Sequence, residues 1–157
     1  MRAIMDTADF ERILRTDLHV YQQYLGTFPA DQLPTHMPPT SLLIVNCCNS
    51  GYPGEHWLAL CKSGGTLEVF DSYGMNPNFY NMLGKLPTSS VIRYSTRQLQ
   101  SLHSSVCGYY CLYYCFYKAR GYSLDNIISN FSNDYSNNDL YVYNAVFNLF
   151  YNYFKRH

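Results

Sequence analysis

Two short apolar runs on either side of a glycine turn constrain the fold more than any other feature. The runs are His56 to Cys61 and Thr66 to Asp71, and Lys62-Ser63-Gly64-Gly65 lies between them. Apolar runs of roughly four to eight residues around a Gly-Gly pair are typical of a β-hairpin. Counted outward from the turn, His56 and Asp71 stand at matching distances to within about two residues. The hairpin therefore predicts that an imidazole and a carboxylate meet at its open end.

The remaining elements mix helices and strands without an internal repeat, which predicts a single α+β domain over residues 1–157. Besides the hairpin, we expect strands over Ser41 to Cys48 and Ser90 to Tyr94, with an extended loop from Thr27 to Thr40, a turn over Asn49 to Gly54 and a loop over Asn130 to Asn138. The first helix is expected to run through Phe10, Ile13 and Leu14 with Asp6 or Thr7 as its cap. The later helices are expected from Asn76-Pro77 to about Leu83, from Cys107 to Gly121, from Ser123 onward, and from Asp139 to Phe154.

Charge and hydropathy narrow the functional classes. The 11 basic and 11 acidic residues balance, so no basic excess indicates nucleic-acid binding. No apolar stretch approaches the roughly 18 residues of a membrane span. Asp6, Asp9 and Glu11 lie where a signal peptide would need an apolar core. We therefore expect a monomeric intracellular protein that does not enter a membrane.

The cysteines are expected to be free thiols in a reducing compartment. They are Cys47, Cys48, Cys61, Cys107, Cys111 and Cys115. The last three lie four residues apart, on one stripe of the predicted helix, which is typical of packing. They lack zinc-ligand spacing and no histidine pair accompanies them, so we expect no metal and no cofactor.

Four residues supply the parts of a cysteine protease. A thiol is mostly protonated at neutral pH and needs an imidazole or a helix N-terminus to form thiolate. Cys107 begins a predicted helix, His56 would accept its proton, and Asp71 would orient the imidazole. The Cys107 amide and the Gln100 side chain would stabilise an oxyanion, and Gly108 would leave room for a substrate backbone. Taken singly, each of these residues also fits an ordinary structural role.

Several segments resemble the adenains, the maturation cysteine proteases of adenoviruses, and more distantly the SUMO-specific proteases of the same clan. The segments are Tyr24 to Phe28, Ile44-Val45-Asn46 with His56-Trp57, Val69 to Gly74, and Gln100 with Cys107-Gly108 seven residues later. The resemblance implies a papain-like α+β fold, with the nucleophile helix packed on a mostly antiparallel sheet. It also implies Cys107 as nucleophile, His56 as base, Asp71 as orienting acid and Gln100 as oxyanion donor. Trp57 is implied to pack beside the imidazole, over a cleft that accepts glycine.

The resemblance implies a polypeptide substrate with glycine next to the scissile bond. The first hypothesis is a viral or virus-like protease that matures capsid precursors, acting in the host nucleus or cytoplasm and in the virion. A protease that removes ubiquitin-like modifiers and an inactive binding module on the same fold are the alternatives. Adenains use a disulfide-linked peptide and DNA as activators. This chain has no cysteine between Lys62 and Val106, where the activating disulfide would fall. The resemblance is therefore applied to the catalytic site alone, and the need for an activating peptide or DNA stays open.

Overall fold

The computed structural model describes residues 4–47, 56–81, 86 and 90–155 and has the predicted α+β composition. The strands are β1 (Tyr24–Pro29), β2 (Thr40–Asn46), β3 (Trp57–Ser63), β4 (Thr66–Phe70) and β5 (Val91–Tyr94). The helices are α1 (Thr7–Leu14), α2 (Leu18–Tyr21), α3 (Cys107–Lys118), α4 (Leu124–Ile128), α5 (Tyr135–Leu149) and α6 (Tyr151–Phe154), with 3₁₀ turns η1 (Ala30–Gln32) and η2 (Pro77–Tyr80).

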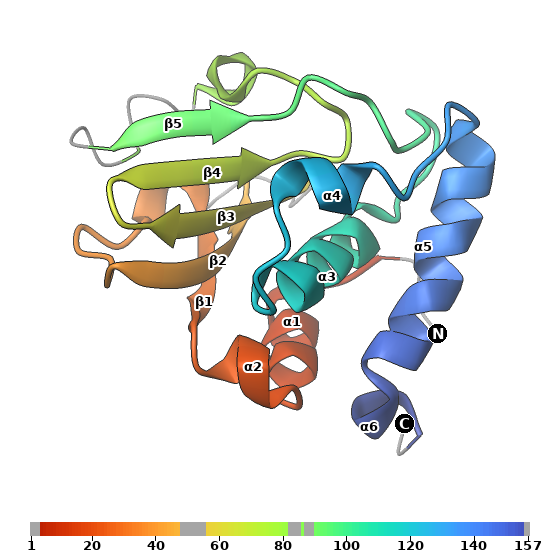
Figure 1. The fold of residues 1–157 in the computed structure, drawn as a ribbon, viewed down its shortest axis with the longest axis horizontal. Coiled ribbons are helices and arrows are strands. Elements are labelled where there is room, and N and C mark those ends of the chain that lie inside the picture. The colour runs from red at the N-terminus through yellow and green to blue at the C-terminus, as the bar shows by residue number, and fades with distance from the viewer. Residues whose placement is uncertain (1–3, 48–55, 82–85, 87–89, 156–157) are drawn as a thin grey trace.

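The five strands form one mixed sheet in the order β1-β2-β3-β4-β5 (Figure 1). The central pairs β2/β3 and β3/β4 are antiparallel, whereas β1/β2 and β4/β5 are parallel. The expectation of a mostly antiparallel sheet is therefore wrong. Each edge strand is joined to its neighbour by a long connection, and only a long connection lets consecutive strands run parallel.

The central hairpin has the predicted geometry. Its ladder runs from Ser63 opposite Thr66 to Ala59 opposite Phe70, and Gly64 takes the left-handed conformation that a tight turn requires. Asp71 is the first residue after β4, and His56 directly precedes β3. The two are two residues out of register, as the count from the turn predicts. Lys62 and Ser63 belong to β3, so the turn itself is shorter than expected.

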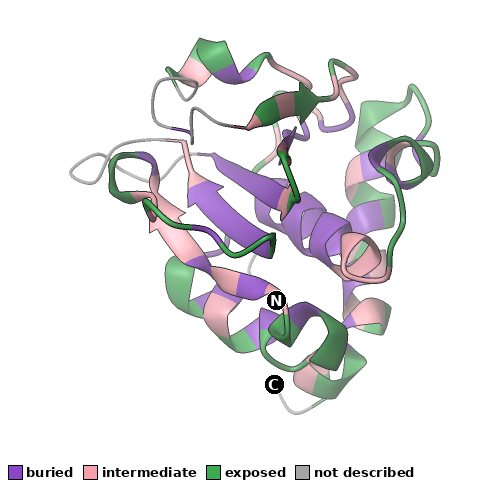
Figure 2. Ribbon diagram, turned by 60° about the vertical axis from the view of Figure 1, so that its left-hand side comes forward, coloured by how far each residue is buried: buried purple, intermediate pink, exposed green. Residues whose placement is uncertain are grey.

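The larger apolar cluster lies between one face of the sheet and α3, and α5 covers α3 from the far side (Figures 1 and 2). A second cluster on the opposite face of the sheet includes Leu43, Leu58 and Val69. Tyr109, Tyr110, Tyr113 and Tyr114 on α3 are fully buried. Buried hydroxyls need hydrogen-bond partners. The Tyr110 hydroxyl donates to Asp139 at 2.8 Å, and the Tyr114 hydroxyl donates to Glu68 at 2.5 Å. The tyrosine-rich helix is therefore a core element that polar anchors fix in place.

The N-terminal half departs from the expected loop. Residues 24–29 form β1, although Gly26 and Pro29 favour irregular structure, because parallel pairing with β2 outweighs local preference at a sheet edge. Asp17 caps the unpredicted helix α2. Asp6 caps α1 in a capping box with Asp9, as predicted.

The C-terminal half also differs from the expected boundaries. Asp134 accepts a hydrogen bond from the Asn137 amide and starts α5 inside the predicted loop over residues 130–138. The last helix is interrupted at Phe150. The expected helix after Asn76 is one 3₁₀ turn that ends at Asn81, whose φ is 58°. The predicted turn over residues 49–54 and the helix end at Leu83 fall outside the described residues.

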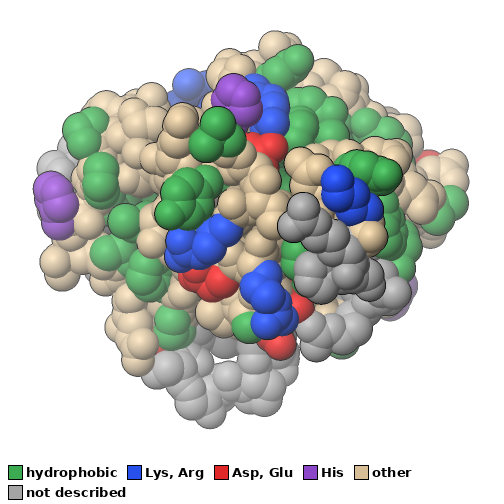
Figure 3. Space-filling view, turned by 90° about the horizontal axis from the view of Figure 1, so that it is seen from below, with side chains coloured by type: hydrophobic (Ala, Val, Ile, Leu, Met, Phe, Trp, Pro, Cys, Tyr) green, Lys and Arg blue, Asp and Glu red, His purple; other side chains and the backbone are tan. Residues whose placement is uncertain are grey.

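The surface carries no concentrated charge on the face seen in Figure 3, where basic side chains are dispersed among acidic and uncharged ones. Two of the described arginines are paired with acids: Arg15 with Glu11 at 2.7 Å and Arg120 with Asp17 at 2.6 Å. In the described part of the chain, no helix is long and apolar enough to cross a membrane.

Asn138 joins α5 to the segments before the predicted active site. It is 3% exposed, and its Nδ2 donates to Leu99 O at 3.0 Å and to Ser132 O at 2.8 Å. Its Oδ1 accepts from the Ser132 amide at 2.9 Å. The Asn138 side chain therefore satisfies backbone groups of Leu99 and Ser132. Because Leu99 directly precedes Gln100, this contact also links α5 to the Gln100 segment.

Replacing Asn138 by Ala should lower the free energy of unfolding by about 1–3 kcal/mol, because buried backbone groups lose their partners. Asn144→Ala on the exposed side of the same helix is the matched control, and alanine should be neutral or slightly stabilising there. Urea denaturation measures both variants. Equal stability of the two would contradict the role assigned to Asn138.

Candidate active site

His56 and Asp71 form a buried pair at the open end of the hairpin. The His56 Nε2 atom lies 2.6 Å from Asp71 Oδ1, and the residues are 5% and 3% exposed. His56 directly precedes β3 and Asp71 directly follows β4, so both lie beyond the last ladder pair, Ala59 and Phe70. The hairpin therefore brings the two residues to the same end of the sheet, and Nε2 is the imidazole nitrogen that faces the carboxylate.

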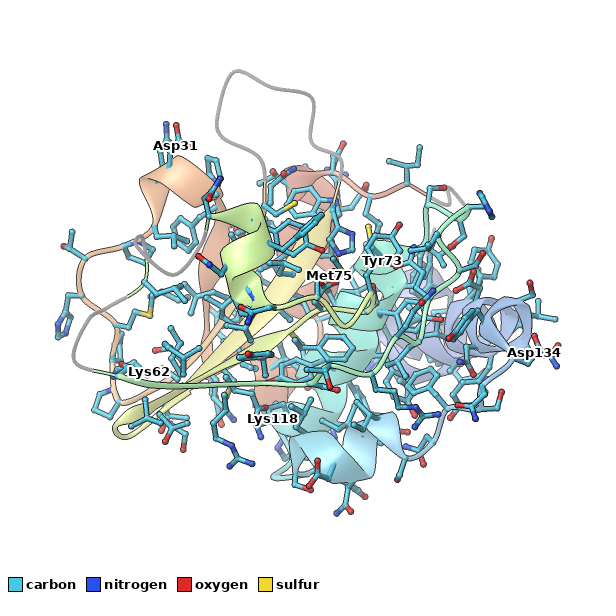
Figure 4. All side chains as sticks on the ribbon, turned by 90° about the horizontal axis from the view of Figure 1, so that it is seen from above. Asp31, Lys62, Tyr73, Met75, Lys118 and Asp134 are labelled. Atoms are coloured by element: carbon cyan, nitrogen blue, oxygen red, sulfur yellow. The ribbon has the colours of Figure 1, made fainter. Side chains whose placement is uncertain are left out.

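The Asp71 carboxylate is held by further donors from the segment that follows β4. Oδ1 accepts the Tyr73 amide at 2.9 Å, and Oδ2 accepts the Met75 amide at 3.3 Å and the Tyr80 hydroxyl at 2.6 Å. Figure 4 shows Tyr73 and Met75 beside one end of α3, with Lys118 at the other end. These contacts fix the carboxylate so that it can orient the imidazole.

The other imidazole nitrogen belongs to the part of the site that includes Cys107. Nδ1 of His56 is buried and makes no hydrogen bond of normal geometry. Burial lowers the pKa of His56, but the hydrogen bond to Asp71 and the nearby Cys107 outweigh burial and raise it to about 9. Cys107 thus raises the pKa of His56 although Nδ1 makes no hydrogen bond of normal geometry.

Cys107 differs from the other buried cysteines in its place in the fold. Burial raises the pKa of Cys61 to about 11, and it raises the pKa of Cys111 well above its usual range. Cys107 instead begins α3, where the first amides have no intrahelical acceptor and the helix dipole favours an anion. The sequence prediction for Cys107 is therefore consistent with a helix-terminal thiol beside an imidazole.

Gln100 is fully buried and is joined to the residue after the acid. Its Oε1 accepts the Ser72 hydroxyl at 2.6 Å, and its backbone amide donates to Ser72 O at 3.0 Å. Both hydrogen bonds from Nε2 go to Ser104, at 3.2 Å to the carbonyl and 3.1 Å to the hydroxyl. To serve an oxyanion, the amide has to exchange one of these contacts.

Gly74 explains how the Gln100 segment reaches this position. Its φ is +68°, and a Cβ there would stand 2.5 Å from the Arg97 carbonyl carbon and 2.7 Å from the Gln98 nitrogen. Only glycine allows this backbone-to-backbone approach. The turn Asp71 to Gly74 therefore brings the two segments together, and it closes with a Gly74 amide to Asp71 carbonyl bond of 2.9 Å.

Gly108 and Trp57 are arranged differently from the sequence expectation. A Cβ on Gly108 would lie 3.1 Å from Phe10 Cζ and 3.2 Å from Met5 Cβ, so the N-terminal segment fills the room that was assigned to substrate. Trp57 packs edge-on against Phe10 at 4.8 Å, and its Nε1 donates to Met5 O at 3.1 Å. The ring that stacks on the imidazole belongs to Tyr73. A substrate contact of Trp57 or of the Gly108 backbone stays a prediction.

Sequence reasoning missed two aromatic residues of the site. Tyr73 stacks on His56 with ring centroids 4.3 Å apart and 17° between the planes, and Tyr80 lies tilted at 5.8 Å. Asp71-Ser72-Tyr73-Gly74 has the composition of a β-turn, and that signal locates Tyr73 next to the acid. Nothing in the local pattern predicts that its ring covers the imidazole.

No family model matches the chain, and no curated protein sequence matches it either. Within the described residues, no three histidine, cysteine or acidic side chains are grouped so as to hold a metal ion. The functional argument therefore depends on the geometry of His56, Asp71 and Cys107, and the likeness to adenains stays a resemblance of motifs.

The raised pKa of His56 predicts a pH dependence of stability. Folding holds the imidazolium more tightly than the unfolded chain does, so this stabilisation is complete below the ordinary value of 6.5 and is lost as pH rises through about 9. Asp71→Asn removes the partner charge. The stability difference between wild type and Asp71→Asn should shrink over that interval in urea denaturation, and a constant difference would contradict the assigned ion pair.

Gly108→Ala should crowd Met5 and Phe10 and lower stability by about 1–3 kcal/mol, since the packed segment has to shift. Gly65→Ala is the control, because a Cβ there meets nothing within 4 Å. Thermal unfolding compares the two. A loss confined to Gly65→Ala would show that the contact between α3 and the N-terminal segment is misassigned.

Proposed function

We propose that this protein is a thiol endopeptidase that hydrolyses polypeptides next to glycine. The observation that carries the proposal is the buried His56–Asp71 pair, whose second imidazole nitrogen has no aligned partner and is coupled to Cys107. A base oriented by an acid, next to a thiol at a helix N-terminus, is the arrangement that nucleophilic catalysis requires.

The proposed chemistry follows from these groups. His56 takes the Cys107 proton, and the thiolate attacks the scissile carbonyl carbon to form a C–S bond and an oxyanion. The Cys107 amide and Gln100, once it leaves Ser104, stabilise that oxyanion. The intermediate breaks its C–N bond as the imidazolium protonates the leaving amine. Water, deprotonated by His56, then attacks the thioester, breaks the C–S bond and releases the carboxylic acid.

The proposed preference for glycine rests on the resemblance to adenains and on the tightness of the site. Cys107 is 6% exposed, so a bulky residue beside the scissile bond would collide with the surrounding protein. The resemblance further favours capsid precursors of a virus or virus-like element as substrates. A folded ubiquitin-like modifier is the competing substrate, and the test below separates the two.

Two electrophilic probes test the activity: a short peptide vinyl sulfone ending in Gly-Gly, and ubiquitin or SUMO carrying a C-terminal electrophile. We expect the short probe to label the protein at Cys107 and Cys107→Ala to abolish labelling. His56→Gln should slow labelling by about a hundredfold or more, because the thiol loses its base. Mass spectrometry of the modified peptide locates the adduct.

His19→Gln is the matched control, since His19 is exposed on α2, and it should label like wild type. Preferential capture by the whole modifier would replace the proposed processing role by removal of modifiers. Labelling by neither probe, or labelling that does not depend on His56, would contradict a thiol peptidase.

A further inference from the structure

Tyr73 contacts three groups that the proposed reaction uses. Its ring stacks on the His56 imidazole at 4.3 Å, and its backbone amide donates to Asp71 Oδ1 at 2.9 Å. Its hydroxyl donates a long hydrogen bond of 3.5 Å to Ser104 O, the carbonyl that also accepts from the Gln100 amide.

The turn fixes this placement before any substrate binds. Asp71 and Gly74 are the ends of the turn, and the Gly74 amide closes it on the Asp71 carbonyl. The Asp71 side chain accepts the Tyr73 amide two residues on, which is an Asx turn. These two hydrogen bonds hold the backbone of Tyr73 within the turn, and its ring stacks on the imidazole from there.

We propose that Tyr73 is a positioning residue, which fixes the plane of the His56 imidazole and ties it to the Gln100 segment through Ser104. An aromatic face stabilises the imidazolium over the neutral ring. A fixed ring plane also keeps Nδ1 directed to Cys107 while Nε2 stays on Asp71. This inference rests on the proposed thiol chemistry and adds a residue that the sequence does not identify.

The experiment compares the rate of Cys107 alkylation by iodoacetamide as a function of pH in wild type, Tyr73→Leu, Tyr73→Phe and His56→Gln, with the Cys107 peptide quantified by mass spectrometry. Tyr73→Leu removes the aromatic face, so the rate of alkylation at neutral pH should fall about tenfold. The midpoint at which His56 loses its proton in the pH profile should drop by roughly one pH unit. Tyr73→Phe keeps the face and should recover most of that rate. The amount by which Tyr73→Phe falls below wild type in peptide cleavage measures the contribution of the lost hydroxyl hydrogen bond to Ser104.

Tyr122→Leu, near the far end of α3, is the matched control and should alkylate like wild type. Circular dichroism and thermal unfolding establish that each variant is folded, and the Phe variant keeps the test meaningful if the Leu variant is not. The inference is overturned if Tyr73→Leu matches wild type in rate and midpoint, or if Tyr73→Phe is as impaired as Tyr73→Leu. If His56→Gln alkylates as fast as wild type, the proposed function itself fails, irrespective of Tyr73.

Discussion

The Asp71 carboxylate is almost completely removed from water and accepts hydrogen bonds from four donors. The donors are the His56 imidazole, the Tyr73 and Met75 amides and the Tyr80 hydroxyl. A buried carboxylate without partners would cost several kcal/mol, so these segments are bound to one another through it. The position of the imidazole, the turn after β4 and the orientation of η2 all depend on this one group.

The position of Cys107 depends on the contacts that hold α3. Its tyrosines are buried between the sheet and α5, and their hydroxyls are anchored on Glu68 and Asp139. The N-terminal segment packs against the start of α3, where Gly108 leaves no side chain in the way. These contacts therefore set the position of Cys107 at the start of α3, and the His56–Asp71 pair lies beside it at the open end of the hairpin.

Gln100, the proposed oxyanion donor, is positioned by a different set of contacts. Gly74 lets the Gln98 segment approach the Asp71 turn backbone to backbone, and the Ser72 hydroxyl then holds the Gln100 amide. Asp71 and Gln100 are thus linked through Ser72, which follows Asp71 in the chain and donates a hydrogen bond to the Gln100 side chain. Both hydrogen bonds that the Gln100 side-chain amide donates go to Ser104, the carbonyl oxygen and the hydroxyl.

The sequence predicts the contacts that depend on local register. His56 and Asp71 are paired because the glycine turn and the two runs leave one antiparallel alignment, and Cys107 marks a helix start. Contacts that depend on distant packing are not predictable in this way. Gly108 makes room for Met5 rather than substrate, and β1 forms against local preference because β2 offers it an edge. The ring of Tyr73 has no periodic signal at all.

The account depends most on the coupling between His56 and Cys107, which nitrogen-15 NMR of histidine-labelled protein measures directly. The His56 resonances should titrate near pH 9 in wild type, because Asp71 and Cys107 both raise the pKa. In Cys107→Ala the midpoint should move to lower pH, since one of the two contributions is gone. A midpoint near 6.5 in both proteins would contradict the coupling, and with it the assignment of this site as a thiol active site.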